Sequence, residues 1–161
     1  MGNLKVPQKP VILVFVRYYL PAYRAGGPVR SLSNLVRALG SEYDFRVVCF
    51  DRDLGSRHPY PTVVPEQWQR LDDAMVRYAD PRELGFAFCK KMLSDTKPDM
   101  IYLNSLFDRA FSMKPFLVLG RGSGIPILLT PRGELSSGAL SLKAGRKWLF
   151  LSAVRAVGFY N

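Results

Sequence analysis

The chain has 161 residues, of which 48% are hydrophobic, and its formal net charge is +10. A chain of this length can bury about two-thirds of the surface that its unfolded form exposes, which predicts one globular core. Its 22% charged and 12% aromatic residues exclude a disordered or repetitive protein. The excess positive charge favours an anionic partner, which could be nucleic acid, a phosphorylated metabolite or an acidic membrane surface.

The two cysteines, Cys49 and Cys89, lie in apolar runs without the spacing of a metal site. We therefore expect buried free thiols, and with them a reducing compartment. No apolar run has the length of a signal peptide core or of a membrane-spanning helix. These features predict a cytoplasmic protein, either in solution or peripheral on the inner face of the membrane.

The first half of the chain reads as a strand, a helix and a second strand. Residues 11–16 form a continuous β-branched and aromatic run, which is typical of a strand buried on both faces. A loop over residues 17–27 leads to a helix with Pro28 in its first turn and Gly40 at its end. A second strand over residues 45–50 completes a βαβ unit, which predicts a right-handed crossover.

The second half continues this alternation. Residues 51–69 contain three prolines, at positions 59, 61 and 65, and predict an irregular excursion. The elements expected after it are a short strand over 75–78, a helix over 81–93, a strand over 99–103, a helix over 110–119 and a strand over 125–130. The alternation predicts an α/β fold with a Rossmann-like, doubly wound parallel sheet.

The end of the sequence predicts an unfinished domain. From Ala139 onward the apolar spacing indicates a long amphipathic helix, with Lys143, Arg146 and Lys147 on its polar side. Doubly wound sheets normally add a strand after such a helix, but the sequence stops at Asn161. We therefore expect residues 1–161 to be a single incomplete domain, truncated before its last strand, whose open edge could cause a truncation-induced dimer.

The loop before the first helix contains a double glycine, Gly26 and Gly27. Open parallel sheets bind ligands beyond the carboxyl ends of their strands, and a helix N-terminus without side chains suits a phosphate group. Phosphate contact and a plain glycine turn are equally compatible with this spacing. The pattern is not the glycine fingerprint of dinucleotide-binding domains, which argues against an NAD enzyme.

Two other features favour a solvated turn over chemistry. Asp51-Arg52-Asp53 matches a short pattern that holds a divalent metal in some nucleotide-sugar enzymes, but such tripeptides are common and no metal is assigned. His58 is the only histidine, and no nucleophile or carboxylate stands with it as a triad.

The loop after the last predicted strand is the richest in functional groups. Arg132 offers a planar cation for a phosphate or carboxylate, and Glu134 could accept sugar hydroxyls or act as a base. An Arg–Glu surface pair beside a serine-capped helix start is an equally good interpretation of these residues.

Taken together, these loops resemble the N-terminal half of GT-B glycosyltransferases, in the large retaining "group 1" family that includes many lipopolysaccharide and capsule sugar transferases. The resemblance covers nearly the whole chain. Its strongest segments are Tyr19-Leu20-Pro21 with Gly26-Gly27-Pro28-Val29-Arg30-Ser31-Leu32, Leu103-Asn104-Ser105-Leu106-Phe107, and Thr130-Pro131-Arg132-Gly133-Glu134-Leu135 with the following Gly138-Ala139-Leu140-Ser141-Leu142-Lys143.

The resemblance implies a two-domain enzyme with an acceptor-side domain here and a donor-binding domain beyond it, without a catalytic metal or other cofactor. Many relatives carry a histidine in the loop after the last strand, and this chain does not. The resemblance assigns catalysis to Arg132 and Glu134, and binding of the donor diphosphate or substrate to Gly26, Gly27, Arg30, Asn104, Ser105 and Gly133.

The expected function is transfer of a hexose from a UDP- or GDP-sugar to a glycan or lipid-linked acceptor in cell-surface polysaccharide biosynthesis. The paired glutamates of the family's donor domain are not among these residues, so the fragment alone is expected to be inactive. This hypothesis includes no nucleic-acid partner, and Lys143, Arg146, Lys147 and Arg155 either face an anionic membrane or only solvate their helix. The alternative is a non-catalytic α/β module that binds nucleic acid or another anionic ligand.

Overall fold

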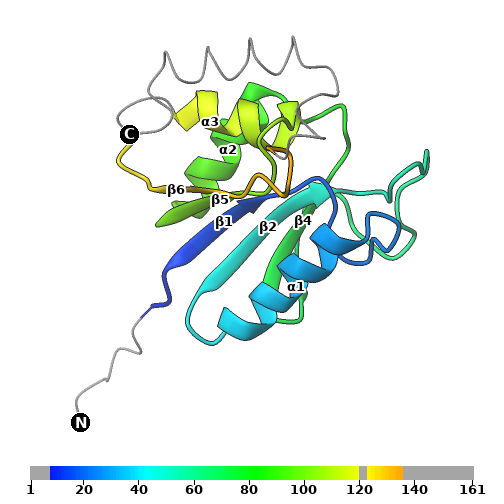
Figure 1. Cartoon of the computed structure of the whole chain (residues 1–161), viewed down its shortest axis with the longest axis horizontal. Helices are drawn as coiled ribbons and strands as arrows, with labels where there is room; N and C mark the ends of the chain where they lie inside the picture. Colours follow the sequence, from blue (N-terminus) through cyan, green and yellow to red (C-terminus); the bar gives the residue numbers. More distant parts are fainter. Residues whose placement is uncertain (1–7, 120–122, 136–161) are drawn as a thin grey trace.

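The apolar run near the N-terminus forms β1 (Val11–Phe15), an interior strand of a six-stranded sheet. The structure is a computed structural model that describes residues 8–119 and 123–135 (Figure 1). The amphipathic helix and the basic side chains expected beyond Leu135 therefore lie outside the described residues. The expected truncation before a last strand stays a prediction.

The sheet is mostly parallel, with the strand order β3-β4-β2-β1-β5-β6. From β1 the chain moves outward on one side of the sheet and then returns to build the other side. The strands parallel to β1 are β2 (Asp44–Phe50), β4 (Ala74–Ala79), β5 (Met100–Leu103) and β6 (Ile127–Leu129). This arrangement makes the boundary between β1 and β5 the topological switch point, where open α/β sheets bind their ligands.

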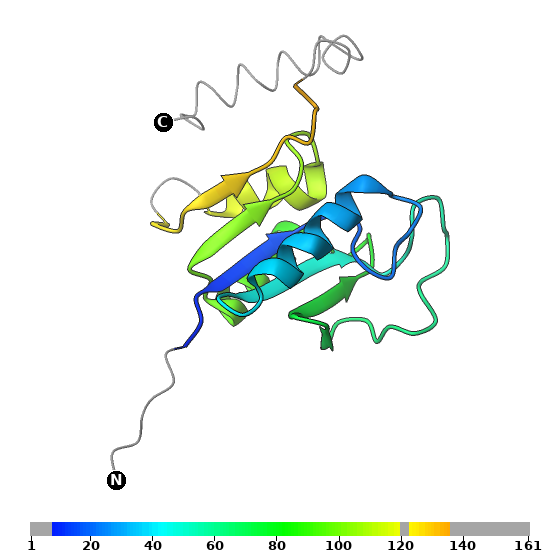
Figure 2. The same ribbon diagram turned by 60° about the horizontal axis from the view of Figure 1, so that its bottom comes forward.

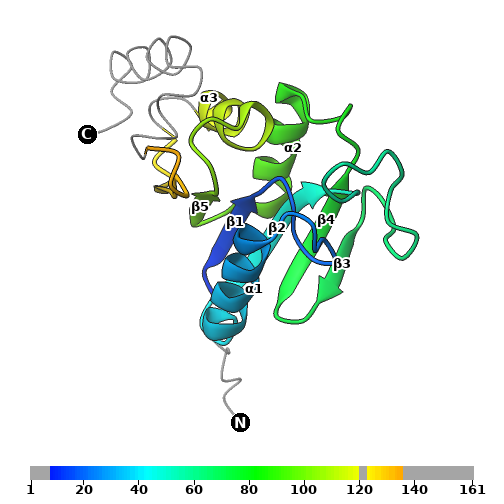
Figure 3. The same cartoon turned by 45° about the vertical axis from the view of Figure 1, so that its right-hand side comes forward.

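Helices cover both faces of the sheet, as a doubly wound α/β fold requires (Figure 3). Successive side chains of a strand point to opposite faces, so each strand contributes to two cores. One core lies under α1 (Gly27–Leu39) and includes Val14, Val47, Leu32 and Val36. The other lies under α2 (Phe86–Thr96), η1 (Arg109–Met113) and α3 (Lys114–Leu119) and includes Phe15, Val48, Met92 and Phe111. The prediction of an α/β fold with a Rossmann-like sheet is thus confirmed at the level of architecture.

The prediction of an entirely parallel sheet is wrong at one edge. β3 (Trp68–Leu71) pairs antiparallel with β4 through a tight turn at Asp72 and Asp73. Asp72 takes a positive φ of 49°, which aspartate tolerates better than most residues. The excursion is therefore irregular only as far as Gln67, and it projects from the sheet beyond β4 (Figure 2). β3 lies at the edge, where a short strand next to prolines is tolerated.

Two predicted helices also differ from the structure. α2 begins at Phe86 and not at Pro81, because Asp80 binds the backbone and side chain of Arg82 and holds this segment in a turn. These hydrogen bonds, with Arg82 the main cause, lower the pKa of Asp80 well below its usual range. The helix predicted over 110–119 is present, but its first part is the π-helix η1. Asp108 caps η1 by accepting hydrogen bonds from the backbone N–H groups of Ala110 and Phe111.

Both cysteines are buried free thiols, as predicted. Burial raises the pKa of Cys89 to about 11 and that of Cys49 further still. Because the thiolate is the reactive form, we expect neither cysteine to react with a thiol reagent near neutral pH while the protein is folded. In urea both should react, and rapid labelling of the native protein would contradict the packing described here.

Gly40 lies where the end of α1 meets the β3–β4 turn. A Cβ atom at Gly40 would lie 2.4 Å from the Cβ of Asp73 and 2.8 Å from the carbonyl oxygen of Val36. We expect Gly40→Ala to lower the free energy of unfolding by about 1–3 kcal/mol, the usual range for overpacking, as measured by urea denaturation.

Gly27 provides the control, since a Cβ there meets nothing within 4 Å. Gly27→Ala should leave the stability unchanged or raise it slightly, because alanine favours a helix over glycine by up to about 1 kcal/mol. Equal unfolding midpoints for Gly40→Ala and the unmodified protein would show that α1 and the turn are not in contact.

Candidate functional site

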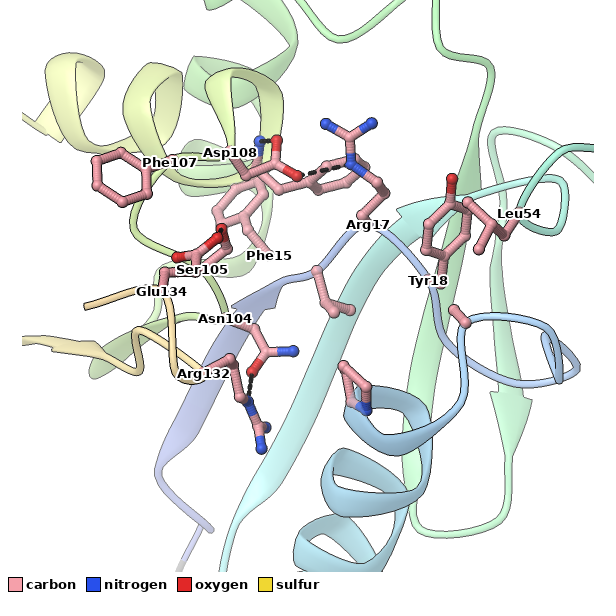
Figure 4. A pocket seen from close by; sticks show the side chains of 14 residues that line it. Phe15, Arg17, Tyr18, Leu54, Asn104, Ser105, Phe107, Asp108, Arg132 and Glu134 are labelled. Atoms are coloured by element: carbon pink, nitrogen blue, oxygen red, sulfur yellow. Dashed lines mark hydrogen bonds and ion pairs between the residues drawn. The ribbon is translucent and has the colours of Figure 1, made fainter. Parts of the chain in front are cut away.

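An open cavity of about 470 Å³ lies at the switch point, beyond the carboxyl ends of β1 and β5 (Figure 4). Its walls come from five parts of the chain. They are the end of β1 with the following loop, the start of α1, Leu54 in the loop after β2, the loop after β5 with the start of η1, and the loop after β6. The cavity is therefore where the fold predicts a ligand.

Asn104 is the first residue after β5 and stands at the centre of the site. Its side-chain oxygen accepts hydrogen bonds from the Nε of Arg132 at 2.5 Å and from the hydroxyl of Thr130 at 3.1 Å. Because a guanidinium can only donate, these contacts fix the orientation of the amide and turn its NH₂ group the other way. This Nδ2 is buried and has no hydrogen-bond partner among the described residues, although the side chain lines the cavity.

Buried polar groups are nearly always hydrogen-bonded, so a buried donor without a partner in a cavity calls for an explanation. Asn104 is only 7% exposed. A ligand oxygen in the cavity would satisfy its Nδ2. This makes Asn104 the strongest single indication that the cavity is a binding site.

Arg132 and Gly133 form a tight turn at one wall of the site. Their φ angles are 50° and 78°, and the N–H of Glu134 donates to the carbonyl of Pro131 at 2.9 Å. Positive φ is unfavourable for arginine, and residues held in such conformations cluster at functional sites. The Arg132 guanidinium also donates to the hydroxyls of Ser31 at 2.7 Å and Tyr102 at 3.1 Å, so it links α1 to β5.

The carboxylate of Glu134 is held on a separate set of partners. It accepts from the hydroxyl of Ser105 at 2.7 Å and from the backbone N–H of Leu106 at 2.5 Å. The turn thus sends Arg132 and Glu134 in different directions, and the interpretation of these two residues as a surface ion pair is wrong. Both side chains line the cavity, and each is held by neutral groups in the described structure.

A second arginine, Arg17, enters the cavity directly after β1. Its Nε donates to the carboxylate of Asp108 at 2.7 Å, and its guanidinium lies 5.5 Å from the centre of the Phe50 ring. The hydrogen bond to Asp108 is the main cause that raises the pKa of Arg17. The Arg17 side chain is 46% exposed, whereas that of Asp108 is 7% exposed, so the cation faces the opening.

The glycines predicted as phosphate contacts lie at the rim. Gly26 caps α1 with a φ of 65°, and Gly27 is the first residue of that helix. Their neighbours Ala25 and Pro28 line the cavity. No atom lies within 4 Å of a Cβ built at either glycine, so a ligand could approach the backbone there. Gly133 similarly lies between two lining residues, Arg132 and Glu134.

The structure does not bring Arg30 into the site. Arg30 is exposed on α1 and is not among the residues that line the cavity. Pro28 lines the cavity, and Arg30 lies two residues further along α1, which places it on roughly the opposite side of the helix. Its assignment as a binding residue gains no support from the geometry.

The aspartates of the Asp51-Arg52-Asp53 pattern are structural, and the expectation of a solvated turn is wrong. They are 3% and 7% exposed. Asp51 binds Arg52 at 2.7 Å, while Asp53 accepts from the backbone N–H groups of Tyr23, Arg24 and Leu54 and so anchors the loop before α1. Within residues 8–119 and 123–135 no three metal-binding side chains gather in one place. His58 is exposed, as predicted.

Sequence reasoning missed Arg17, Asp108 and the backbone of Leu106. Arg17 is the first charged residue after a buried strand, and this position alone could have marked it. Asp108 precedes a helix, where aspartate is a preferred cap. The N–H of Leu106 leaves no signal in a sequence, since any residue could supply it.

A scan against protein-family models and searches of curated proteins and solved structures found no match to this chain. Among the helices that the structure describes, none is long and apolar enough to cross a membrane.

Proposed function

We propose that the chain is the acceptor-side domain of a retaining glycosyltransferase with a GT-B architecture, which moves a hexose from a UDP- or GDP-sugar to a glycan or lipid-linked acceptor. The observation that carries the proposal is the cavity at the switch point between β1 and β5. All three segments that carry the resemblance to this family supply lining residues, namely Pro28, Asn104, Ser105, Phe107, Arg132 and Glu134.

The chemistry of these side chains suits a saccharide. The Nδ2 of Asn104 can donate to a sugar oxygen, and the oxygens of Glu134 keep lone pairs for sugar hydroxyls beyond the bonds to Ser105 and Leu106. Arg132 adds a cation near the place of transfer. Retaining transfer passes through an oxocarbenium-like transition state and releases a diphosphate, which cationic and amide donors stabilise.

The proposed roles divide the site into two parts. Arg132 and Glu134 would act on the transferred sugar and its acceptor, while Gly26 and Gly27 at the rim would approach the diphosphate from this side of the cleft. The donor nucleotide would be held by a second domain outside these residues. Neither a metal nor another cofactor enters the proposed reaction.

The test is a nuclear magnetic resonance titration of the chain with neutral and acidic mono- and oligosaccharides, with UDP- and GDP-hexoses and with a short oligonucleotide. We expect saccharides to shift the signals of the Asn104 side chain and of residues 105–108, with little effect at the opposite end of the sheet. A non-catalytic nucleic-acid module would instead bind the oligonucleotide, with an affinity that falls steeply as salt is added. That result, without any saccharide binding, would overturn the proposal.

A further inference from the structure

We infer that the cavity takes an acidic saccharide, whose carboxylate or phosphate group lies against Arg17 and Asn104 while its hydroxyls lie against Glu134. The inference deepens the proposed function and rests on it in taking the ligand to be a saccharide. It adds a specificity-determining residue, Arg17, and a chemical class of ligand.

Arg17 is held in one orientation before any ligand arrives. Its Nε is bonded to Asp108, and its planar group stacks over Phe50. Phe50 is in turn fixed by an edge contact with Phe111, with ring centroids 4.9 Å apart. A guanidinium fixed in this way loses little conformational freedom on binding, which favours affinity for a planar or tetrahedral oxyanion.

The partner of Arg17, Asp108, also lines the cavity, but both of its oxygens are bonded within the protein. Asp108 is buried, and its other oxygen accepts from the N–H groups of Ala110 and Phe111 at 2.9 and 3.0 Å. The carboxylate is therefore directed into the start of η1, where the helix end also stabilises a negative charge. In Figure 4 the Nε of Arg17 faces Asp108, and its two terminal nitrogens lie on the side away from β1.

Asn104 provides an independent observation that points to the same kind of ligand. Its buried Nδ2 is a donor without a partner in the described structure. Arg17 and Asn104 are thus both donors, and both line one cavity. Two donors that line one cavity, one of them charged, match a ligand group that has only acceptor atoms, such as a carboxylate or a phosphate.

Glu134 defines the other end of the ligand. A negative group placed against this carboxylate would be repelled, but hydroxyl groups could donate to it. The cavity therefore favours a ligand with hydroxyl groups at the wall formed by the loop after β6 and an anionic group at the wall formed by Arg17. An acidic saccharide, either a uronic acid or a sugar phosphate, carries both groups on one small molecule.

The experiment measures dissociation constants of the chain for glucuronate, glucose 6-phosphate, glucose and inorganic phosphate. We expect both acidic sugars to bind at least about tenfold more tightly than glucose. Arg17→Met should reduce their affinity to that of glucose, because it keeps an apolar stem over Phe50 and removes the cation. Arg37→Met, at an exposed position near the far end of α1, should change nothing.

A second variant tests whether a loss of affinity in Arg17→Met comes from the removed cation or from a loss of folding. Arg17→Lys keeps the charge but loses the forked donor geometry, so it should bind acidic sugars with intermediate affinity. The pH dependence of the affinity distinguishes a phosphate from a carboxylate as the bound anion. Affinity for glucose 6-phosphate should rise between about pH 5 and about pH 7.5 as the phosphate gains its second charge, whereas affinity for glucuronate should stay constant.

The outcomes separate this inference from the proposed function. Equal affinity for glucose and glucuronate would overturn the acidic ligand and leave a neutral saccharide site. An unchanged preference for acidic sugars in Arg17→Met would overturn the role of Arg17. Arg17-dependent binding of inorganic phosphate without any saccharide binding would overturn the saccharide, and with it the proposed function. Binding of none of the four probes would overturn both.

Discussion

Replacing Asn104 by aspartate is expected to leave the protein folded while it reduces sugar transfer about 100-fold or more. The introduced carboxylate still offers an oxygen to the Nε of Arg132 and to the hydroxyl of Thr130, so the contacts that hold the loops together remain. The other atom of the group changes, because the buried donor Nδ2 is replaced by a carboxylate oxygen, which is an anionic acceptor. A ligand oxygen then meets a negative charge in place of a hydrogen bond, and sites that lose such a polar contact discriminate by about this factor.

The measurement compares sugar transfer by the product of the complete reading frame that contains these residues, and its urea unfolding midpoint, between the variant and the unmodified protein. Asn34→Asp makes the same chemical change at an exposed position on α1 and should affect neither quantity. If Asn104→Asp transferred sugar at the normal rate, the unpaired Nδ2 would not face the ligand. A large fall in stability would instead show that its hydrogen bonds are not preserved.

Replacing Glu134 by glutamine is expected to lower the rate of transfer by about 10²–10⁴-fold, the range found when a group that handles protons in the transition state is removed. The change conserves size and keeps one oxygen for the bond from Ser105 or from the backbone of Leu106. Stability should therefore fall by no more than about 1.5–3 kcal/mol, the worth of one hydrogen bond to a charged group.

Glu42→Gln is the matched control, because Glu42 is exposed before β2 and is not among the residues that line the cavity. Its transfer rate should equal that of the unmodified protein. An unchanged rate in Glu134→Gln would remove this carboxylate from the mechanism and leave it as an anchor for the loop after β5. A loss of saccharide affinity with a normal maximal rate would assign it to binding alone.

The architecture could be predicted from the sequence because buried parallel strands leave a strong local signal. The runs that became β1, β2 and β5 are continuous and β-branched or aromatic, and their placement agrees with the structure to within a residue or two. β3 left no such signal, since four residues beside a proline-rich segment become a strand only through pairing with β4. The first residue of α2 could not be predicted either, because it depends on the hydrogen bonds between Asp80 and Arg82.

The sequence could predict which segments form the candidate site, but not which residues contact one another within it. The loop after β6 stood out by composition and the loop after β5 by the family resemblance, and four of the residues assigned to the site from these loops line the cavity. The sequence could not show that a turn with two positive φ angles separates Arg132 from Glu134. Nor could it show that Arg17 and Asp108, 91 positions apart, meet at the switch point. Such contacts depend on the order of the strands, which no local pattern encodes.

The most direct test of the proposed transferase is the release of UDP or GDP from nucleotide hexoses by the product of the complete reading frame that contains these residues, with saccharide acceptors present. The account predicts acceptor-dependent release from at least one UDP- or GDP-hexose, with retention of the anomeric configuration and with a large loss in Glu134→Gln. Release from none of the nucleotide hexoses would contradict it. So would release by the Glu134→Gln and Asn104→Asp variants at the rate of the unmodified protein.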